Sequence, residues 1–272
     1  MMVNETCGII AGAGSFPLHV AREATRQGLK VVALGIQGWV DPALASHVDV
    51  YEEIAVGQIG QLIGTLKAHQ IRRAIMAGKV SKEILFDPRV QFDADALLLL
   101  SQVKELSVPA VLGSLVARLA QDGIELLDSS TFLKADLCPV GVLTRRQPTP
   151  VEQEDIRVGA QAARQMAELD IGQTVVVKGA VIVAVEALEG TDAAIARAGQ
   201  LAGTGCVVVK MASANQDMRF DLPILGPKTI ETAIAAGVGC VAVEAGKTLL
   251  LDRDALLAHA NTAKLCVVGL EL

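Results

Sequence analysis

The chain contains 272 residues, of which 51% are hydrophobic and only 3% aromatic. This composition excludes a disordered chain and is sufficient for one large or two small domains with a full core. The scarcity of aromatic side chains and a net charge of −6 argue against a nucleic-acid partner, because such binders need stacking platforms and a basic face. The five cysteines are widely spaced and form no C-x-x-C pair, so we expect free, buried thiols in a reducing cytosol.

Short apolar runs alternate with amphipathic segments in the first half of the chain. Such alternation is typical of a parallel sheet with helices on its faces. We expect strands at residues 7–11, 31–34, 48–51 and 73–77, and helices at residues 16–27, 59–69, 94–104 and 114–121.

A polar segment with two prolines, residues 145–150, interrupts this pattern and predicts a linker. We therefore expect an N-terminal α/β domain over residues 1–140, a linker over 141–150, and a C-terminal α/β domain over 151–272, with a ligand cleft between the domains. A hairpin-like pair is expected around Gly246 and Lys247. In the C-terminal domain we expect helices at 152–169, 192–201, 227–236 and 253–259, and strands at 174–177, 180–185, 206–210, 240–243, 248–251 and 265–268.

The first residues of the chain lack the basic stretch of an export signal. The longest later apolar run, residues 233–243, is shorter than the roughly 20 residues that span a bilayer. We therefore expect a soluble protein.

A glycine-rich turn follows the first predicted strand and leads into the first predicted helix. Gly12, Gly14 and Ser15 are candidate phosphate-binding residues there, because glycines allow close approach to the free N–H groups of a helix start. A tight turn without a ligand is the equally weighted alternative. Pro17 replaces the third glycine of the dinucleotide fingerprint, and no acid ends the second predicted strand, so a dehydrogenase is disfavoured.

The segment from Gly78 to Lys82 follows another predicted strand. Lys79 should therefore lie at the carboxyl edge of the sheet, where open α/β sheets bind ligands and a lysine can meet a phosphate. A solvated lysine in a turn is the alternative.

A polar loop in the second half, residues 210–223, combines two carboxylates with two cations. If the loop is extended, Asp217, Arg219 and Asp221 point to one side. Carboxylates suit Mg²⁺ rather than zinc, and Arg219 and Lys210 could offset phosphate charge. A surface loop with self-compensating charges is the alternative.

A second acidic segment, residues 186–192, follows a predicted buried strand and leads into a helix. Thr191 or Asp192 could simply cap that helix. Together with the glycine turn and the polar loop, it points to metal-assisted chemistry on a phosphate ester or anhydride.

These motifs resemble the UDP-2,3-diacylglucosamine pyrophosphatase family of the LpxI type. The resemblance extends in order over nearly the whole chain and is carried by residues 8–17, 78–80, 186–192, 216–226 and 243–246.

The resemblance implies a Rossmann-like N-terminal domain, a distinct C-terminal α/β domain and a cytoplasmic enzyme of lipid A biosynthesis in a Gram-negative bacterium. It implies Mg²⁺-dependent hydrolysis of UDP-2,3-diacylglucosamine to UMP and 2,3-diacylglucosamine 1-phosphate (lipid X), with attack on the sugar-side phosphorus. The essential carboxylate is then Asp217, with Asp221 as the alternative, and Arg219 is the third candidate catalytic residue.

We expect Asp217 to hold Mg²⁺ with help from Asp221, Glu189 or Asp192. The partner is a lipid-linked nucleotide sugar; a homodimer and a peripheral contact with the inner-membrane surface are left open. The alternatives are a non-catalytic nucleotide-sugar-binding regulator and a nucleotide-sugar dehydrogenase. The expected substrate contacts are Gly12, Gly14, Ser15, Lys79, Thr191, Lys210 and Gln216.

Overall fold

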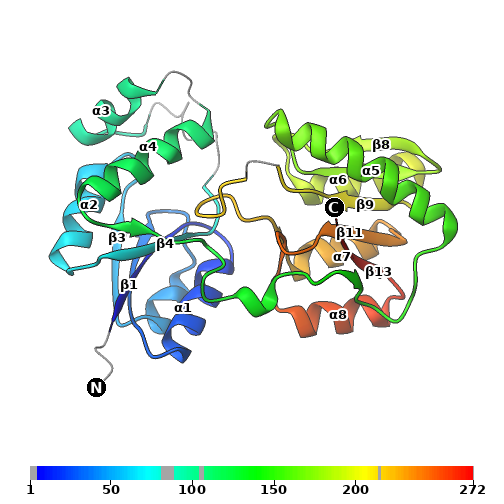
Figure 1. Cartoon of the computed structure of the whole chain (residues 1–272), viewed down its shortest axis with the longest axis horizontal. Coiled ribbons are helices and arrows are strands. Elements are labelled where there is room, and N and C mark those ends of the chain that lie inside the picture. Colours follow the sequence, from blue (N-terminus) through cyan, green and yellow to red (C-terminus); the bar gives the residue numbers. More distant parts are fainter. Residues whose placement is uncertain (1–4, 81–88, 104–106, 214–215, 272) are drawn as a thin grey trace. The chain divides into compact units, whose positions relative to one another are not determined.

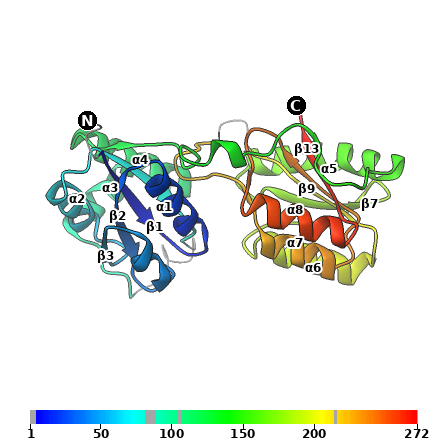
Figure 2. The same ribbon diagram turned by 90° about the horizontal axis from the view of Figure 1, so that it is seen from below.

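The computed structural model describes residues 5–80, 89–103, 107–213 and 216–271. Its internal contacts divide the chain into two units, each of which is an α/β structure (Figures 1 and 2). The N-terminal unit comprises Met1–Leu133 together with Asp217–Asp221, and the C-terminal unit comprises Lys134–Gln216 and Leu222–Leu272. The predicted fold class, with a parallel sheet and flanking helices, is confirmed.

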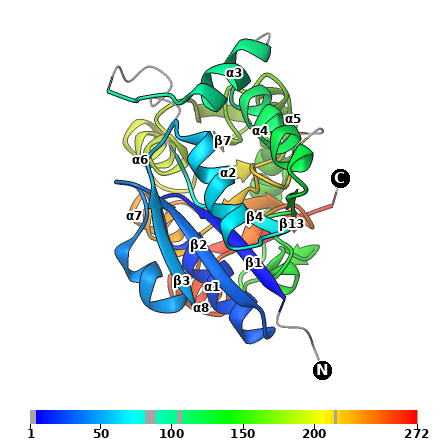
Figure 3. The ribbon, with the colours of Figure 1, turned by 90° about the vertical axis from the view of Figure 1, so that its left-hand side faces the viewer.

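The N-terminal sheet is entirely parallel, with strand order β3-β2-β1-β4-β5 (Figure 3). The order reverses between β1 and β4, and ligands bind at such a switch point in open α/β sheets. Helix α1 packs beside η1, whereas α2, α3 and α4 enclose the apolar core on the other face. The elements are β1 (Thr6–Ala11), α1 (Phe16–Arg26), β2 (Lys30–Ile36), η1 (Pro42–His47), β3 (Val50–Ile54), α2 (Ile59–Ala68), β4 (Arg73–Ala77), α3 (Ala94–Gln102), α4 (Val108–Gln121) and β5 (Glu125–Leu126).

The C-terminal sheet is mixed, with strand order β6-β13-β11-β9-β7-β8, and its central strands β9, β11 and β13 are parallel. Helix α5 packs on one face of this sheet, and α6, α7 and α8 cover the other. The elements are η3 (Lys134–Asp136), β6 (Gly141–Val142), α5 (Pro150–Glu168), β7 (Thr174–Lys178), β8 (Val181–Val185), α6 (Thr191–Ala202), β9 (Val207–Lys210), β10 (Ile224–Leu225), α7 (Pro227–Ala235), β11 (Cys240–Glu244), β12 (Leu249–Leu250), α8 (Arg253–Thr262) and β13 (Cys266–Leu270).

The segment expected to be a linker, residues 141–150, belongs to the C-terminal unit. Its first two residues form β6, which pairs with β13, and its end starts α5. Thr149 and Glu152 form a reciprocal capping box, in which the Thr149 N–H donates to Glu152 Oε2 over 2.8 Å. Pro150 is tolerated because the first residue of a helix needs no N–H donor.

The hairpin predicted around Gly246 and Lys247 is wrong. Strand β12, which follows these residues, pairs in parallel with β10 rather than with β11. The hairpin of this unit joins β7 and β8 around Gly179 and Ala180. A local glycine turn signals a change of direction, but the strand's partner is decided by packing.

All five cysteines are free and buried, as predicted. Burial raises the pKa of the Cys7 thiol to about 12 and that of the Cys138 thiol to about 11. These thiols therefore behave as small apolar side chains.

No helix within the described part of the chain is both long and apolar enough to cross a membrane.

Candidate active site

The two predicted loops of the N-terminal unit meet at the switch point between β1 and β4. The Gly12 N–H donates to the Ala77 oxygen (2.8 Å), and Ala13 and Lys79 exchange main-chain hydrogen bonds of 2.8 and 3.0 Å. A Cβ on Gly12 would lie 2.8 Å from the Lys79 oxygen. A Cβ on Gly78, whose φ is +90°, would lie 2.7 Å from the Ala13 oxygen. Only glycine fits at either position.

The start of α1 is open toward solvent. Gly14 adopts φ +91° and is exposed, and the side chain of Ser15, the N-cap residue, makes no capping hydrogen bond. No side-chain cap therefore competes with a ligand for the first N–H groups of α1, to which Pro17 contributes none. The side chain of Lys79 is exposed on the adjoining loop.

Asp217 and Arg219 form a bidentate ion pair within a turn. Arg219 Nε lies 2.9 Å from Asp217 Oδ1, and Nη2 lies 2.6 Å from Oδ2. The N–H groups of Phe220 and Asp221 both donate to the Asp217 main-chain oxygen. The loop is therefore not extended here, so the condition under which Asp217, Arg219 and Asp221 would point to one side is not met. Asp221 is exposed on the same turn.

The ion pair keeps both side chains charged. Hydrogen bonds from Arg219 lower the pKa of Asp217 against the opposing effect of partial burial. The same pairing raises the pKa of Arg219.

Residues 217–221, hereafter the 217–221 turn, are held on the N-terminal sheet although they come from the second half of the sequence. The Ser129 N–H donates to the Met218 oxygen (2.9 Å), and Ser129 Oγ lies 2.8 Å from the main-chain oxygens of both Met76 and Arg219. Phe220 packs against the core of the N-terminal unit. Because Met76 belongs to β4, the turn lies beside the strand that leads to Lys79.

Sequence reasoning missed Ser129. Its signal is the polar run Asp128-Ser129-Ser130 directly after β5, at the same carboxyl edge as the two glycine loops.

Two predicted substrate contacts, Lys210 and Thr191, meet in the C-terminal unit. Lys210 Nζ lies 3.1 Å from Thr191 Oγ1, which donates to Glu186 Oε1 over 2.8 Å. Burial disfavours the charge of Glu186, but Lys210 and hydrogen bonds from Thr174, Thr191 and the Gln173 N–H outweigh it and lower the pKa of Glu186. Lys210 is itself buried, so this cluster forms a charged group at the end of β9.

The other predicted ligands each have protein partners. Glu189 pairs with Arg197 (2.9 Å), Asp192 accepts from the Thr229 hydroxyl (2.8 Å), and Gln216 accepts from the Ser213 N–H (2.7 Å). Asp217 and Asp221 belong to the N-terminal unit, whereas Glu189 and Asp192 belong to the C-terminal unit.

Within the ranges that the structure describes, no three acidic, histidine or cysteine side chains gather as a metal site. The Mg²⁺ ligands therefore stay a prediction. The motif residues Ser81, Lys82, Ala214 and Asn215 lie outside the described residues, as does Lys104 at the end of a predicted helix.

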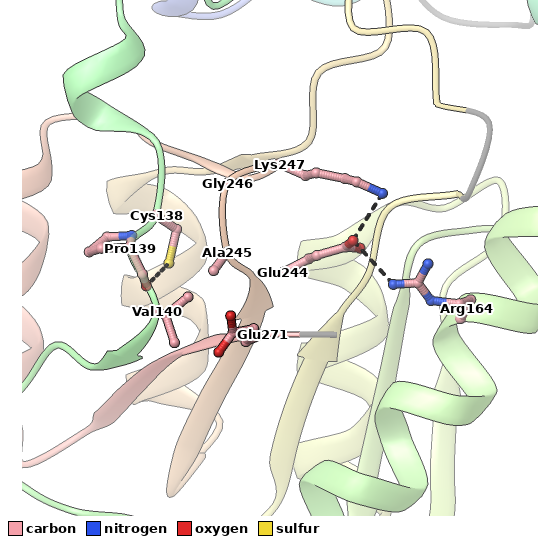
Figure 4. Close-up of a pocket in the computed structure, with 9 residues that line it drawn as sticks. All are labelled: Cys138, Pro139, Val140, Arg164, Glu244, Ala245, Gly246, Lys247 and Glu271. Atoms are coloured by element: carbon pink, nitrogen blue, oxygen red, sulfur yellow. Dashed lines mark hydrogen bonds and ion pairs between the residues drawn. The ribbon is translucent and has the colours of Figure 1, made fainter.

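Another carboxylate, Glu244, is buried at the end of β11 (Figure 4). It lies 3.1 Å from Arg164 and 3.0 Å from Lys247, and it accepts a hydrogen bond from the Ala212 N–H (3.0 Å) just after β9. These charges border a pocket of about 680 Å³ whose wall also includes Cys138. In the sequence, Glu244 stands at the end of an apolar strand, which is the signal for such a buried carboxylate, but this pattern alone predicted no role for it.

Comparisons with known proteins agree over both halves of the chain. A model of the LpxI N-terminal domain matches residues 6–135, and a model of the LpxI C-terminal domain matches residues 139–268. The chain is 29% identical to a Caulobacter vibrioides protein named UDP-2,3-diacylglucosamine pyrophosphatase LpxI, over 276 aligned residues that cover 97% of each chain.

Proposed function

Because this chain belongs to the LpxI family, we propose that it hydrolyses the pyrophosphate bond of UDP-2,3-diacylglucosamine in the lipid A pathway. The products are UMP and 2,3-diacylglucosamine 1-phosphate, formed by attack of water on the sugar-side phosphorus. The observation that carries the proposal is the ionised Asp217–Arg219 pair, held beside β4 at the switch point of the N-terminal sheet.

The N-terminal unit supplies donors for the phosphates. Main-chain N–H groups for a phosphate come from Gly14, Ser15 and the uncapped first turn of α1, because those of Gly12, Ala13 and Lys79 bond between the loops. Lys79 adds a positive charge on the adjoining loop. A guanidinium carries five N–H donors, and the Arg219 side chain gives two of them to Asp217. Arg219 can thus contact a phosphate oxygen while Asp217 holds its orientation, which favours the transition state as charge develops on the phosphate.

Asp217 and Asp221 fit Mg²⁺ as hard oxygen donors on one turn. A metal ligand must be deprotonated, and Arg219 keeps Asp217 in that form by lowering its pKa. When bound there, the ion would neutralise charge on the pyrophosphate oxygens.

Lys210 stays a proposed substrate contact in the C-terminal unit. Its ammonium group donates to Thr191 and has two further N–H donors of the kind that bind phosphate oxygens. In a chain of net charge −6, Lys79 and Arg219 in the N-terminal unit and Lys210 in the C-terminal unit are the basic residues proposed to bind the anionic substrate.

The test is release of UMP from UDP-2,3-diacylglucosamine by the purified protein, with Mg²⁺ and with EDTA. Release with Mg²⁺ and none with EDTA is expected. An Asp217→Ala preparation, purified in the same way, controls for contaminating hydrolases. Substrate that binds but stays intact under both conditions would contradict the proposal and favour a nucleotide-sugar-binding regulator.

A further inference from the structure

We propose that Ser129 is a positioning residue, which docks the 217–221 turn onto the N-terminal sheet and so fixes the Asp217–Arg219 pair for reaction. The kinetic part of this proposal rests on the proposed hydrolase function. The structural part, that one buried hydroxyl orders the turn, does not.

The polar groups of Ser129 are directed at main-chain atoms of two segments that are distant in sequence. Ser129 is only 2% exposed and follows β5. Its N–H binds the Met218 oxygen, and its Oγ lies within 2.8 Å of the main-chain oxygens of Met76 and Arg219. The N–H contact survives replacement of the side chain, whereas the Oγ contacts do not.

The hydroxyl has a single hydrogen, which two carbonyl oxygens share. Those oxygens belong to Met76 in β4 and to Arg219 in the turn, so the serine connects the two segments through their main chains. Without it, both carbonyl oxygens lose this donor, and the turn is held less firmly, by the Ser129 N–H and the packing of Phe220.

Arg219 is thereby held at two places. Its main-chain oxygen is fixed by Ser129, and its guanidinium and N–H are fixed by Asp217. A shift of the Arg219 main chain therefore moves the whole ion pair relative to the loop that carries Lys79. Ser129 acts through Arg219 and Asp217, which makes it a positioning residue and not a catalytic one.

The chain offers a matched control in Ser130. It is 3% exposed, next in sequence, and its hydroxyl donates to Asp128 Oδ1 (2.6 Å), a residue outside the turn. Ser129→Ala and Ser130→Ala therefore remove the same buried group, but only the first removes a contact with the 217–221 turn.

We expect Ser129→Ala to lower kcat for UMP release about 10- to 100-fold, because small misplacements of reacting groups have effects of this size. KM should change little, and Ser130→Ala should keep the kcat of the unchanged protein. Ser129→Cys, nearly the same size but a weaker donor, should give an intermediate kcat. Equal losses of kcat in the Ser129→Ala and Ser130→Ala variants would overturn the proposal.

Amide hydrogen exchange tests the same role without substrate. The N–H groups of Phe220 and Asp221 donate to the Asp217 oxygen only while the turn is formed. Ser129→Ala should accelerate exchange at both amides, and Ser130→Ala should not. Exchange at the original rate in Ser129→Ala would overturn the positioning role, even if the protein proves to release no UMP. If Ser129→Ala fails to fold, the Ser129→Cys variant gives the same comparison with a smaller shift.

Discussion

The carboxyl edges of the two sheets carry different chemical groups. In the N-terminal unit, the edge consists of glycine loops, the open start of α1 and a serine that binds main-chain oxygens. In the C-terminal unit, it consists of two charged clusters, each built around one buried side chain: Lys210 with Glu186 through Thr191, and Glu244 with the partly exposed Arg164 and Lys247.

Because of this difference, we expect substitutions at the two edges to affect different properties, turnover at one edge and stability at the other. The Asp217–Arg219 pair has side chains that are 30% and 42% exposed, so water can replace either partner at small cost. Glu244 is buried, and its removal leaves two cations without their shared carboxylate. Substitutions at the N-terminal edge should therefore reduce turnover in a folded protein, and substitutions at the C-terminal edge should reduce stability.

The largest expected effect is on turnover. Asp217→Ala should lower kcat about 1000-fold, equivalent to about 4 kcal/mol in the barrier, while Tm stays nearly unchanged. UMP release and thermal unfolding measure the two quantities. A kcat within about tenfold of the unchanged protein would remove Asp217 from the mechanism. Asp221→Ala, made in parallel, identifies the essential carboxylate by the larger loss.

The next effect is on stability. Glu244→Ala should lower the free energy of unfolding by about 3–5 kcal/mol, because it breaks a buried ion cluster from one side. Denaturant titration measures this loss. Glu154→Ala is the control, since Glu154 pairs with Arg157 on the surface and its removal should leave the unfolding curve in place. Equal unfolding curves for Glu244→Ala and Glu154→Ala would contradict the expected role of the C-terminal edge in stability.

The glycine loops should show a smaller, mixed effect. Gly78→Ala should cost about 1–3 kcal/mol of stability, because an L-residue is strained at φ +90° and its Cβ would contact Ala13. It should also lower kcat, since the loop carries Lys79. Gly64→Ala in α2, where no atom lies within 4 Å of an added Cβ, should instead be neutral or stabilising. Denaturant titration and UMP release compare the stability and kcat of Gly78→Ala and Gly64→Ala. If the two variants are equally stable and active, the close approach of the glycine loops is contradicted.

The smallest expected effect concerns how the free energy of unfolding depends on pH through Glu186. The pKa of Glu186 is lowered in the folded chain, so its stabilisation is fully present above the pKa of the unfolded chain, about 4.3. It is lost as pH falls through the folded value. Glu186→Gln should flatten the decline of the unfolding free energy in acid. An unchanged slope would mean that Lys210 and the hydrogen bonds from Thr174, Thr191 and Gln173 do not stabilise the ionised carboxylate.

Many elements of the fold could be predicted from consecutive residues. Strand β4 has the bounds expected for it, 73–77, and most helices lie close to their predicted ranges. Helix α4 is the exception, because it begins at Val108, six residues before the predicted start. Both glycine loops were found because turn chemistry and strand–helix boundaries are local properties. The ends of the expected linker could not be placed, because β6 forms only by pairing with β13, more than a hundred residues away.

The sequence by itself determined the order of the longer strands and helices, the family and the residue types available for phosphate chemistry; the two-residue strands β5, β6 and β10 were not predicted. Only the tertiary structure decided which groups meet: Gly12 with Lys79, Ser129 with Arg219, and Glu244 with Arg164. The physical reason is the range of the interactions. Periodicity and turn preference act between neighbours in the chain, whereas a buried carbonyl or charge takes its partner from whichever segment packing brings within reach.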